Sequence, residues 1–248
     1  MGETTKRIIT GAALIAAVAL IGWIDSFFLT WLTLGGVYLL AFYEAGRLYG
    51  LHSNASFFYA ALIWVIAAVY PYPDDLFVLM GVLFASYAAY RPKTDWRLFL
   101  PFVYPTAGML FFLTLYKDYG MLAIAWLIAL VAAADIGAYV VGRTIGKTPF
   151  CETSPKKTLE GVAGGVVLAT LAGMAVGLNF VAPEKAMVIS FMSAVASVFG
   201  DLYESYLKRR AGVKDSGTIL PGHGGVLDRI DGYLFAAIVM VILLRGLV

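Results

Sequence analysis

Long apolar stretches, separated by short polar turns, make up most of this chain. A helix needs about 20 mostly apolar residues to cross the ~30 Å hydrocarbon layer of a bilayer, and most of these stretches approach that length. The pattern predicts nine membrane-spanning helices, at residues 8–24, 27–43, 57–70, 76–90, 98–116, 120–141, 161–181, 186–207 and 232–247. The third and fourth are short, and a count of eight or ten is also compatible with the pattern. The expected fold is therefore all-α, a polytopic integral membrane protein with short loops.

The composition supports a membrane protein and limits the other possibilities. Of the 248 residues, 61% are hydrophobic and 14% are charged, whereas about a quarter of the residues in a soluble domain are charged. The net charge of +2 is too small to indicate a nucleic-acid partner. Cys151 is the only cysteine, which excludes an intrachain disulfide and a Cys-based zinc site. We expect two regions, N-terminal helices at 1–116 and a C-terminal region at 117–248 that carries most of the polar motifs.

Lys and Arg are distributed unequally between the two sides of the predicted membrane. With nine spans, fifteen of the 18 basic residues fall on the side of the N-terminus, and Lys117, Lys185 and Arg245 fall on the other. Cytoplasmic loops carry an excess of Lys and Arg, so the N-terminus and the large polar loops are predicted to be cytoplasmic. The expected location is a bacterial-type cytoplasmic (inner) membrane.

Acidic residues are concentrated where the eighth span ends and the ninth begins. Asp201 and Glu204 are three residues apart, as are Asp228 and Asp231, so in a helix each pair of carboxylates lies on one face. Mg²⁺ prefers oxygen ligands and usually takes one or two carboxylates, while water and substrate phosphate fill its other positions. These four residues are the candidate metal ligands, Asp215 would support them, and a second cation is compatible with the site. The alternative is that they are ordinary loop charges paired with nearby Lys and Arg.

A glycine-rich segment around a histidine precedes the second acidic pair. Gly222, Gly224 and Gly225 allow the backbone to approach a ligand closely, which would let its amides face phosphate oxygens. His223 would shape the floor of such a site, and a simple hydrogen-bonded loop residue accounts for it equally well.

Basic residues cluster between the sixth and seventh predicted spans. Arg143 and Lys147 are candidate phosphate contacts, and Lys156 and Lys157 would neutralise a triphosphate or hold an anionic lipid headgroup. The alternative is that they only follow the positive-inside pattern and bind lipid without specificity. Asp135 lies about two turns inside the sixth span, where a solitary carboxylate is costly, so we expect it to support a metal site.

One more charged pair lies near the end of the second span. Glu44 and Arg47 are spaced to meet on one helix face. We expect an exposed, solvent-screened ion pair, which the pattern favours over a functional role.

The polar pattern that begins at Ser205 resembles a family signature at every defined position. It reads Ser-x-Leu-Lys-Arg, four residues, Lys-Asp-x-Gly, three residues, then Pro-x-His-Gly-Gly-Val-x-Asp-Arg-Ile-Asp, ending at Asp231. This is similar to the signature of the phosphatidate cytidylyltransferase family. A second block, from Asp135 to Gly161, looks like the cytoplasmic loop that precedes it in that family. The resemblance covers about the last 115 residues, and before Asp135 it rests on hydropathy alone.

The resemblance implies that CTP and phosphatidic acid give CDP-diacylglycerol and pyrophosphate, at a cytoplasmic-side active site in the region 117–248. The paired carboxylates point to Mg²⁺ as cofactor, the membrane spans imply membrane lipids as partners, and the resemblance suggests a homodimer. The expected catalytic residues are Asp201, Asp228, Asp231, Lys208, Arg209 and His223. The expected substrate-binding residues are Arg143, Lys147, Ser154, Lys156, Lys157, Lys214, Asp215, Gly224, Gly225 and Arg229.

Two other functions fit parts of the pattern. A CTP-dependent polyprenol-type lipid kinase would transfer the γ-phosphoryl group and release CDP. An ion-coupled transporter would use intramembrane acids, but the charges cluster in predicted cytoplasmic motifs rather than near the midplane, where carriers bind.

Overall fold

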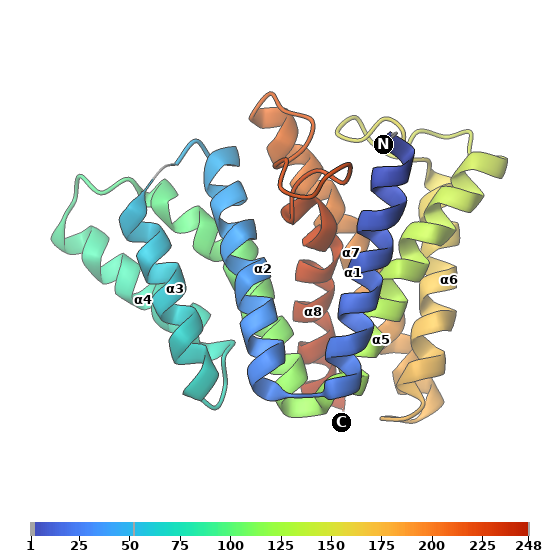
Figure 1. The fold of residues 1–248 in the computed structure, drawn as a ribbon, viewed down its shortest axis with the longest axis horizontal. Coiled ribbons are helices and arrows are strands. Elements are labelled where there is room, and N and C mark those ends of the chain that lie inside the picture. The colour runs from blue at the N-terminus through green and yellow to red at the C-terminus, as the bar shows by residue number, and fades with distance from the viewer. Residues whose placement is uncertain (1–2, 52, 248) are drawn as a thin grey trace. The chain divides into compact units, whose positions relative to one another are not determined.

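Helices account for the regular secondary structure throughout the described part of the chain (Figure 1). The structure is a computed structural model that describes residues 3–51 and 53–247, with side chains described from Ile9 onward. Its α-helices are α1 (Glu3–Ile24), α2 (Phe27–Leu48), α3 (Asn54–Val69), α4 (Asp75–Tyr90), α5 (Ala107–Ile145), α6 (Leu159–Gly177), α7 (Pro183–Arg210) and α8 (Leu227–Leu247). The all-α prediction is confirmed.

The apolar spans predicted from the sequence are helical, but two of them belong to one element. A 3₁₀ turn η1 (Trp96–Phe99) and a π-helical turn η2 (Phe102–Thr106) lead into α5, which is interrupted at Gly120. Gly120 has φ 76° and ψ −175°, a conformation that side chains disfavour, so the helix changes direction there. The interruption falls at the first residue of the predicted sixth span, next to the gap at residues 117–119.

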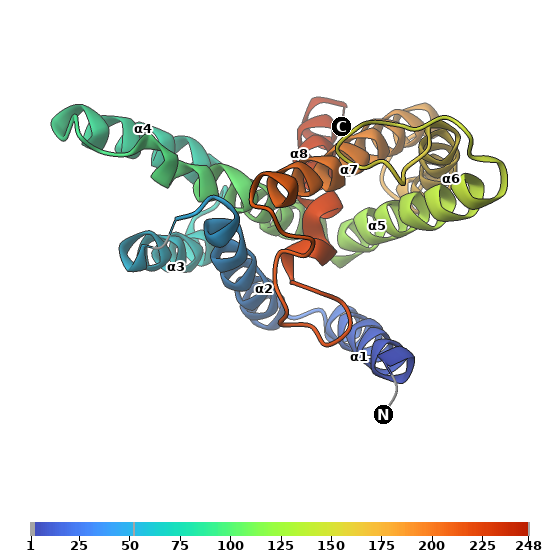
Figure 2. The ribbon, with the colours of Figure 1, turned by 90° about the horizontal axis from the view of Figure 1, so that it is seen from above.

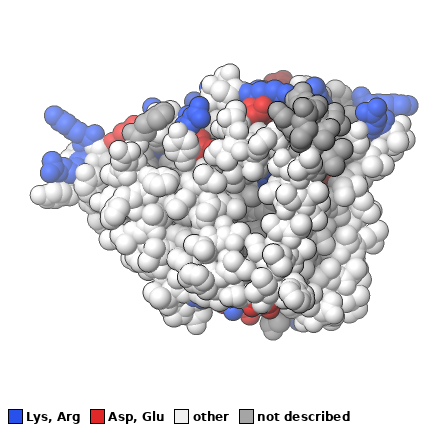
Figure 3. All heavy atoms as spheres, viewed as in Figure 1, with Lys and Arg blue, Asp and Glu red and all other residues white. Residues whose placement is uncertain are grey.

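The helices have the lengths and surfaces of an integral membrane protein. Five helical stretches are long and apolar enough to cross a bilayer, namely α2, Trp96–Ile145, α6, α7 and α8, while α1, α3 and α4 contribute shorter apolar helices. Large apolar side chains such as Ile15 and Val69 are exposed along the helices, as expected where lipid replaces water. Figure 3 shows the drawn face almost free of charge between its upper and lower edges, where the coloured Lys, Arg, Asp and Glu side chains lie. A polytopic membrane protein is confirmed, and the count of nine spans stays a prediction.

The chain divides by its internal contacts into two compact units. Unit 1 comprises Met1–Thr114 and Arg210–Arg229, and unit 2 comprises Leu115–Arg209 and Ile230–Val248. The borders fall inside α5 and α8 and before the last residue of α7. The division into regions 1–116 and 117–248 stays a prediction.

Unit 1 is built on aromatic packing around α2, which lies against α3 and η2. The ring of Tyr38 contacts that of Trp64, and the ring of Phe42 contacts that of Phe102, with centroids 5.2 and 5.1 Å apart. A Cβ at Gly35 would collide with the indole of Trp64, so α2 and α3 approach closely there. This packing fixes the C-terminal turns of α2, which contribute to the site described below.

Unit 2 is built on close helix crossings, and Figure 2 shows α5, α6 and α7 near one another. Glycines at the crossing points make the close approach possible. On α5 and α6, a Cβ at Gly137 would lie 2.9 Å from the Cα of Gly165, and a Cβ at Gly161 would lie 3.0 Å from the Cα of Gly142. Such contacts let backbones approach as they do in membrane helix pairs. The crossings bring the C-terminal end of α5 to the N-terminal end of α6, where residues 146–158 form the connecting loop.

Candidate active site

The loop that joins α7 to α8, residues 211–226, is called the signature loop here because it carries most of the family-like pattern. It closes on itself where Leu220 N donates to Gly224 O at 3.0 Å and His223 N donates to Leu220 O at 2.9 Å. Gly222 and Gly224 have φ values of 76° and 82°, in the left-handed region that glycine tolerates best. These two glycines therefore allow a backbone path that other residues disfavour.

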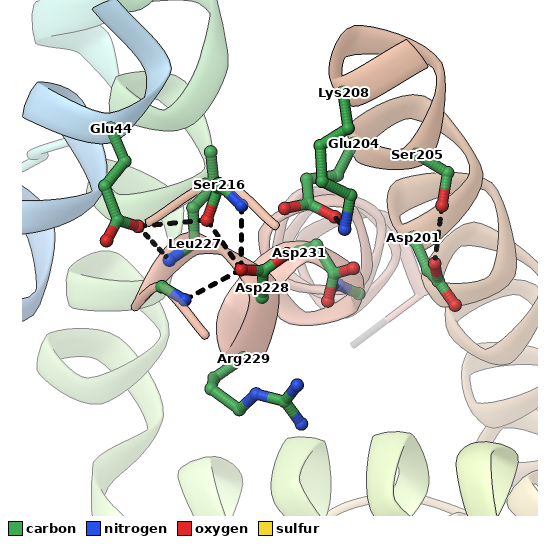
Figure 4. Close-up of polar contacts among 12 residues, drawn as sticks. Glu44, Asp201, Glu204, Ser205, Lys208, Ser216, Leu227, Asp228, Arg229 and Asp231 are labelled. Atoms are coloured by element: carbon green, nitrogen blue, oxygen red, sulfur yellow. Dashed lines mark hydrogen bonds and ion pairs between the residues drawn. The ribbon is translucent and has the colours of Figure 1, made fainter. Parts of the chain in front are cut away.

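Asp228, in the first turn of α8, holds this loop with one carboxylate oxygen (Figure 4). Its Oδ2 accepts hydrogen bonds from Ser216 N at 2.9 Å, Ser216 Oγ at 2.9 Å and Gly225 N at 2.8 Å. A Cβ at Gly224 would lie 2.8 Å from the same oxygen. The backbone therefore wraps around the carboxylate and holds it in one orientation.

Glu44, near the C-terminus of α2, is the residue that sequence reasoning missed. Its side chain is 1% exposed, and its two carboxylate oxygens accept hydrogen bonds from Val226 N at 3.1 Å, Leu227 N at 2.8 Å and Ser216 Oγ at 3.2 Å. The expected exposed pair with Arg47 is therefore wrong. An acid within an apolar span was the available signal, because such residues are usually buried for a purpose.

Other predicted residues of unit 1 surround this arrangement. Arg229 Nε donates to His223 O at 3.1 Å, and His223 Nδ1 lies 3.4 Å from Pro221 O. Lys214 and Asp215 are exposed on the signature loop. Unit 1 thus brings together the predicted residues of the signature loop. Lys214 and Arg229 are exposed at its surface, and Asp228 is half-buried.

Unit 2 contains a cavity of about 540 Å³, lined by the C-terminal half of α5, the start of α6 and the middle of α7. Its charged and phenolic lining consists of Asp135, Tyr139, Arg143, Lys156, Lys157 and Asp201. The Lys157 ammonium forms an ion pair with Asp201 Oδ2, and Ser205 Oγ lies 3.4 Å from Asp201 Oδ1. Cations and acids around one hollow suit a phosphorylated ligand bound together with a cation.

Two more expected acids lie in unit 2 near Asp201. Asp231, one turn into α8, is within electrostatic range of Asp201, Asp135 and Lys208. Glu204 is fully buried and forms an ion pair with Lys208, one turn along α7 (Figure 4). Arg209 follows at the exposed end of the same helix. Asp231 is thus repelled by the carboxylates of Asp201 and Asp135, and the positive charge of Lys208 partly offsets this repulsion.

The donor chemistry in unit 2 fits Mg²⁺, although the protein does not supply a complete ligand set. Over residues 3–51 and 53–247, no three His, Cys, Asp or Glu side chains form a group able to hold a metal ion. Mg²⁺ usually takes only one or two carboxylates and completes its shell with water and phosphate. Asp201 already accepts one cation, the Lys157 ammonium, so its carboxylate is placed to receive positive charge.

The loop between α5 and α6 is held by Glu160, in the first turn of α6. Its carboxylate accepts hydrogen bonds from Lys147 N at 3.1 Å and Thr148 Oγ1 at 2.8 Å, and Lys157 N donates to Ser154 O at 3.0 Å. Lys147 and Ser154 lie on this loop and are not among the residues that line the cavity. Of the expected phosphate contacts in this block, Arg143, Lys156 and Lys157 face the cavity.

Comparisons with known proteins agree over nearly the whole chain. The sequence profile of the cytidylyltransferase family matches residues 5–247. A phosphatidate cytidylyltransferase of Helicobacter pylori strain J99 is 45% identical over 242 residues, covering 96% of this chain and 91% of the relative. One from Thermotoga maritima is 34% identical over 229 residues, covering 84% of this chain and 85% of the relative. The profile match extends far before Asp135, where the sequence alone offered only hydropathy.

Proposed function

The chain belongs to the cytidylyltransferase family, and from that premise we propose that it is a phosphatidate cytidylyltransferase. It transfers the cytidylyl group of CTP to phosphatidic acid and produces CDP-diacylglycerol and pyrophosphate. The observation that carries this function is the likeness, over nearly full length, to curated relatives named for that activity. The charged cavity of unit 2 and the preorganised Asp228 of unit 1 are chemically suited to it.

The reaction needs no nucleophilic side chain. An oxygen of the lipid phosphate forms a bond to the α-phosphorus of CTP, while the bond from that phosphorus to the α–β bridging oxygen breaks and pyrophosphate leaves with the electron pair. A phosphate monoester is already anionic near neutral pH, because its second pKa is about 6. What the protein must supply is the approach of two polyanions and the stabilisation of charge on the leaving group.

The basic residues of each unit are assigned to this electrostatic work. In unit 2, Arg143, Lys156 and Lys157 line the cavity and would neutralise phosphate oxygens, with Arg143 offering a bidentate fork. Lys208 and Arg209, at the end of α7, and Lys214 and Arg229, around the signature loop, are assigned to the triphosphate. Lys147 and Ser154 remain candidates through the loop that Glu160 holds.

Carboxylates are proposed as Mg²⁺ ligands in each unit separately. In unit 2 the proposed ligand is Asp201, supported by Glu204 and Asp231, and in unit 1 it is Asp228, supported by Asp215. Bound Mg²⁺ would neutralise the triphosphate and the departing pyrophosphate. The hydrogen bonds from Ser216 and Gly225 keep the Asp228 carboxylate in a single orientation, and the ion pair with Lys157 keeps Asp201 at the cavity wall.

We further propose that the active site faces the cytoplasm, from a bacterial inner membrane. In unit 2, Arg143, Lys156 and Lys157 line the cavity, whereas Lys117 and Lys185 are not among its lining residues. An excess of basic residues beside the cavity is what the positive-inside pattern favours for a cytoplasmic side. CTP would then enter from water while the acyl chains stay in the bilayer. A homodimer is proposed on the family resemblance.

One assay tests the function directly. Purified protein is incubated with Mg²⁺, phosphatidic acid and CTP labelled in the cytosine ring. We expect the label to enter the lipid phase and pyrophosphate to appear in equal amount. A lipid kinase would instead leave all of the label in water as CDP, which would contradict the proposed reaction.

A further inference from the structure

Helix α2, in the N-terminal half of the chain, contacts the signature loop and the first residue of α8. Glu44 of α2 is 172 residues before Ser216 and 183 residues before Leu227, yet it accepts hydrogen bonds from both. Two of the three donors described above are the backbone amides of Val226 and Leu227, at the point where the signature loop becomes α8. A negative charge beside the first amides of a helix is a favourable arrangement.

The signature loop is shaped to fit this carboxylate. A Cβ at Gly217 would collide with the Glu44 carboxylate, and a Cβ at Gly225 would lie 2.6 Å from Glu44 Oε2. Ser216, next to Gly217 in the chain, is buried. The loop therefore encloses the end of the Glu44 side chain, and its glycines are needed for that close approach.

Ser216 links Glu44 to Asp228 (Figure 4). Its Oγ lies 3.2 Å from Glu44 Oε2 and 2.9 Å from Asp228 Oδ2, and its backbone amide also donates to Asp228 Oδ2. A single hydroxyl thus contacts both carboxylates. A shift of Glu44 would therefore be transmitted to the groups that orient Asp228.

We infer that Glu44 is a positioning residue for cytidylyl transfer, which holds the signature loop and the first turn of α8 so that Asp228 keeps one orientation. This inference rests on the proposed function, because only there does the orientation of Asp228 affect turnover. Two backbone amides donate to this carboxylate, and the Ser216 hydroxyl, whose single proton is shared between Glu44 and Asp228, adds a third contact. The loop is therefore restrained at three points. Nothing in this role requires Glu44 to touch a substrate.

The test compares Glu44→Gln with Asp74→Asn, in purified protein that contains the full chain. The Glu44→Gln substitution keeps the shape of the side chain but replaces one acceptor oxygen with a donor that faces amide and hydroxyl donors. Asp74 is a matched control, a buried carboxylate of the same unit that accepts a hydrogen bond from Thr114 Oγ1 at 2.9 Å and lies beyond the C-terminal end of α3.

Two readouts separate positioning from general stability. Hydrogen exchange followed by mass spectrometry should show peptides from 211–228 exchanging about tenfold faster in Glu44→Gln, and at the wild-type rate in Asp74→Asn. In kinetics, kcat should fall by about 30-fold in Glu44→Gln while the KM for CTP changes less than about threefold, because the interaction lost is one that orients a catalytic group. Asp74→Asn should keep both constants within about twofold.

A second variant keeps the inference testable if Glu44→Gln does not fold. Ser216→Ala leaves Glu44 in place, removes the shared hydroxyl and should change loop exchange and kcat in the same direction. In the double variant the two effects should be less than additive, since both act on one contact. The inference would be overturned if the signature loop of Glu44→Gln exchanged hydrogen at the wild-type rate. If Glu44→Gln does not fold, it would be overturned if Ser216→Ala showed wild-type loop exchange and wild-type kcat. An inactive wild type would instead refute the proposed function, while loop exchange would still report the contact.

Discussion

The ammonium of Lys157 forms an ion pair with the carboxylate of Asp201 on the wall of the unit 2 cavity. Each group thereby neutralises the charge of the other. If a triphosphate bound Lys157 and a cation bound Asp201, the ion pair would break. Two stronger interactions, ammonium with phosphate and carboxylate with cation, would replace it. The ion pair thus keeps both groups at the cavity without leaving an isolated charge there.

The first prediction concerns Lys157 and its neighbour. Lys157→Gln should lower kcat/KM for CTP about 100-fold, a loss of about 2.7 kcal/mol in transition-state stabilisation, because this lysine is proposed to contact phosphate. Lys156→Gln should lower it about tenfold or less, because Lys156 is exposed and water screens its charge. Steady-state kinetics at varied CTP measure both. Equal losses in the two variants would contradict a special role for the ion-paired lysine.

The second prediction tests the carboxylates proposed to hold Mg²⁺. Asp201→Asn and Asp228→Asn should each abolish turnover while the protein remains folded in detergent, because a neutral amide is a poor Mg²⁺ ligand. Asp118→Asn is the control, since Asp118 forms an ion pair with Arg245 at 3.1 Å in unit 2, away from the cavity lining. It should retain activity within about twofold. Activity within about tenfold of wild type in both site variants, about 1.4 kcal/mol, would contradict the assignment.

The helical architecture was predictable because the hydropathy of a short stretch of sequence is enough to identify a membrane helix. The gap predicted at residues 117–119 lies next to Gly120, whose positive φ interrupts α5. The two large polar loops predicted from the sequence also lie between helices, one between α5 and α6 and the other between α7 and α8. What hydropathy alone does not supply is which helices touch, because the close α5 and α6 crossing depends on Gly137 and Gly165 meeting across the pair.

The site was predictable in composition and much less so in geometry. The pattern around Asp228 identified the loop and its glycines, since local spacing carries that information. The partnership of Lys157 with Asp201 joins two separate blocks, and spacing within either block says nothing about it. Glu44 was assigned to an exposed pair because its nearest charged neighbour in sequence is Arg47, whereas its partners lie more than 170 residues away in the chain.

The third prediction fixes the orientation of unit 2 in the membrane. Cys151, on the loop between α5 and α6, should react with an impermeant maleimide in inside-out vesicles and not in intact cells. A Cys151→Ser variant that also carries Lys185→Cys should show the opposite result, because residue 185 is exposed in the first turn of α7, at the other end of α6. Labelling of Cys151 from outside intact cells would reverse the proposed orientation.

The last prediction separates backbone strain from damage to the site, using two glycines of the signature loop. Gly212 and Gly224 both have positive φ, 70° and 82°, so an alanine at either position strains the backbone by about 1 kcal/mol. A Cβ at Gly212 would meet nothing within 4 Å, whereas a Cβ at Gly224 would lie 2.8 Å from Asp228 Oδ2 and would push that carboxylate from its place. Both variants should therefore lose thermal stability in detergent, and Gly224→Ala should lose more, because its Cβ also displaces the carboxylate that holds the loop. Only Gly224→Ala should lose activity strongly, with kcat reduced about 100-fold or more, while Gly212→Ala stays within about threefold of wild type. Equal kcat values in the two folded variants would show that the placement of the Asp228 carboxylate does not limit turnover.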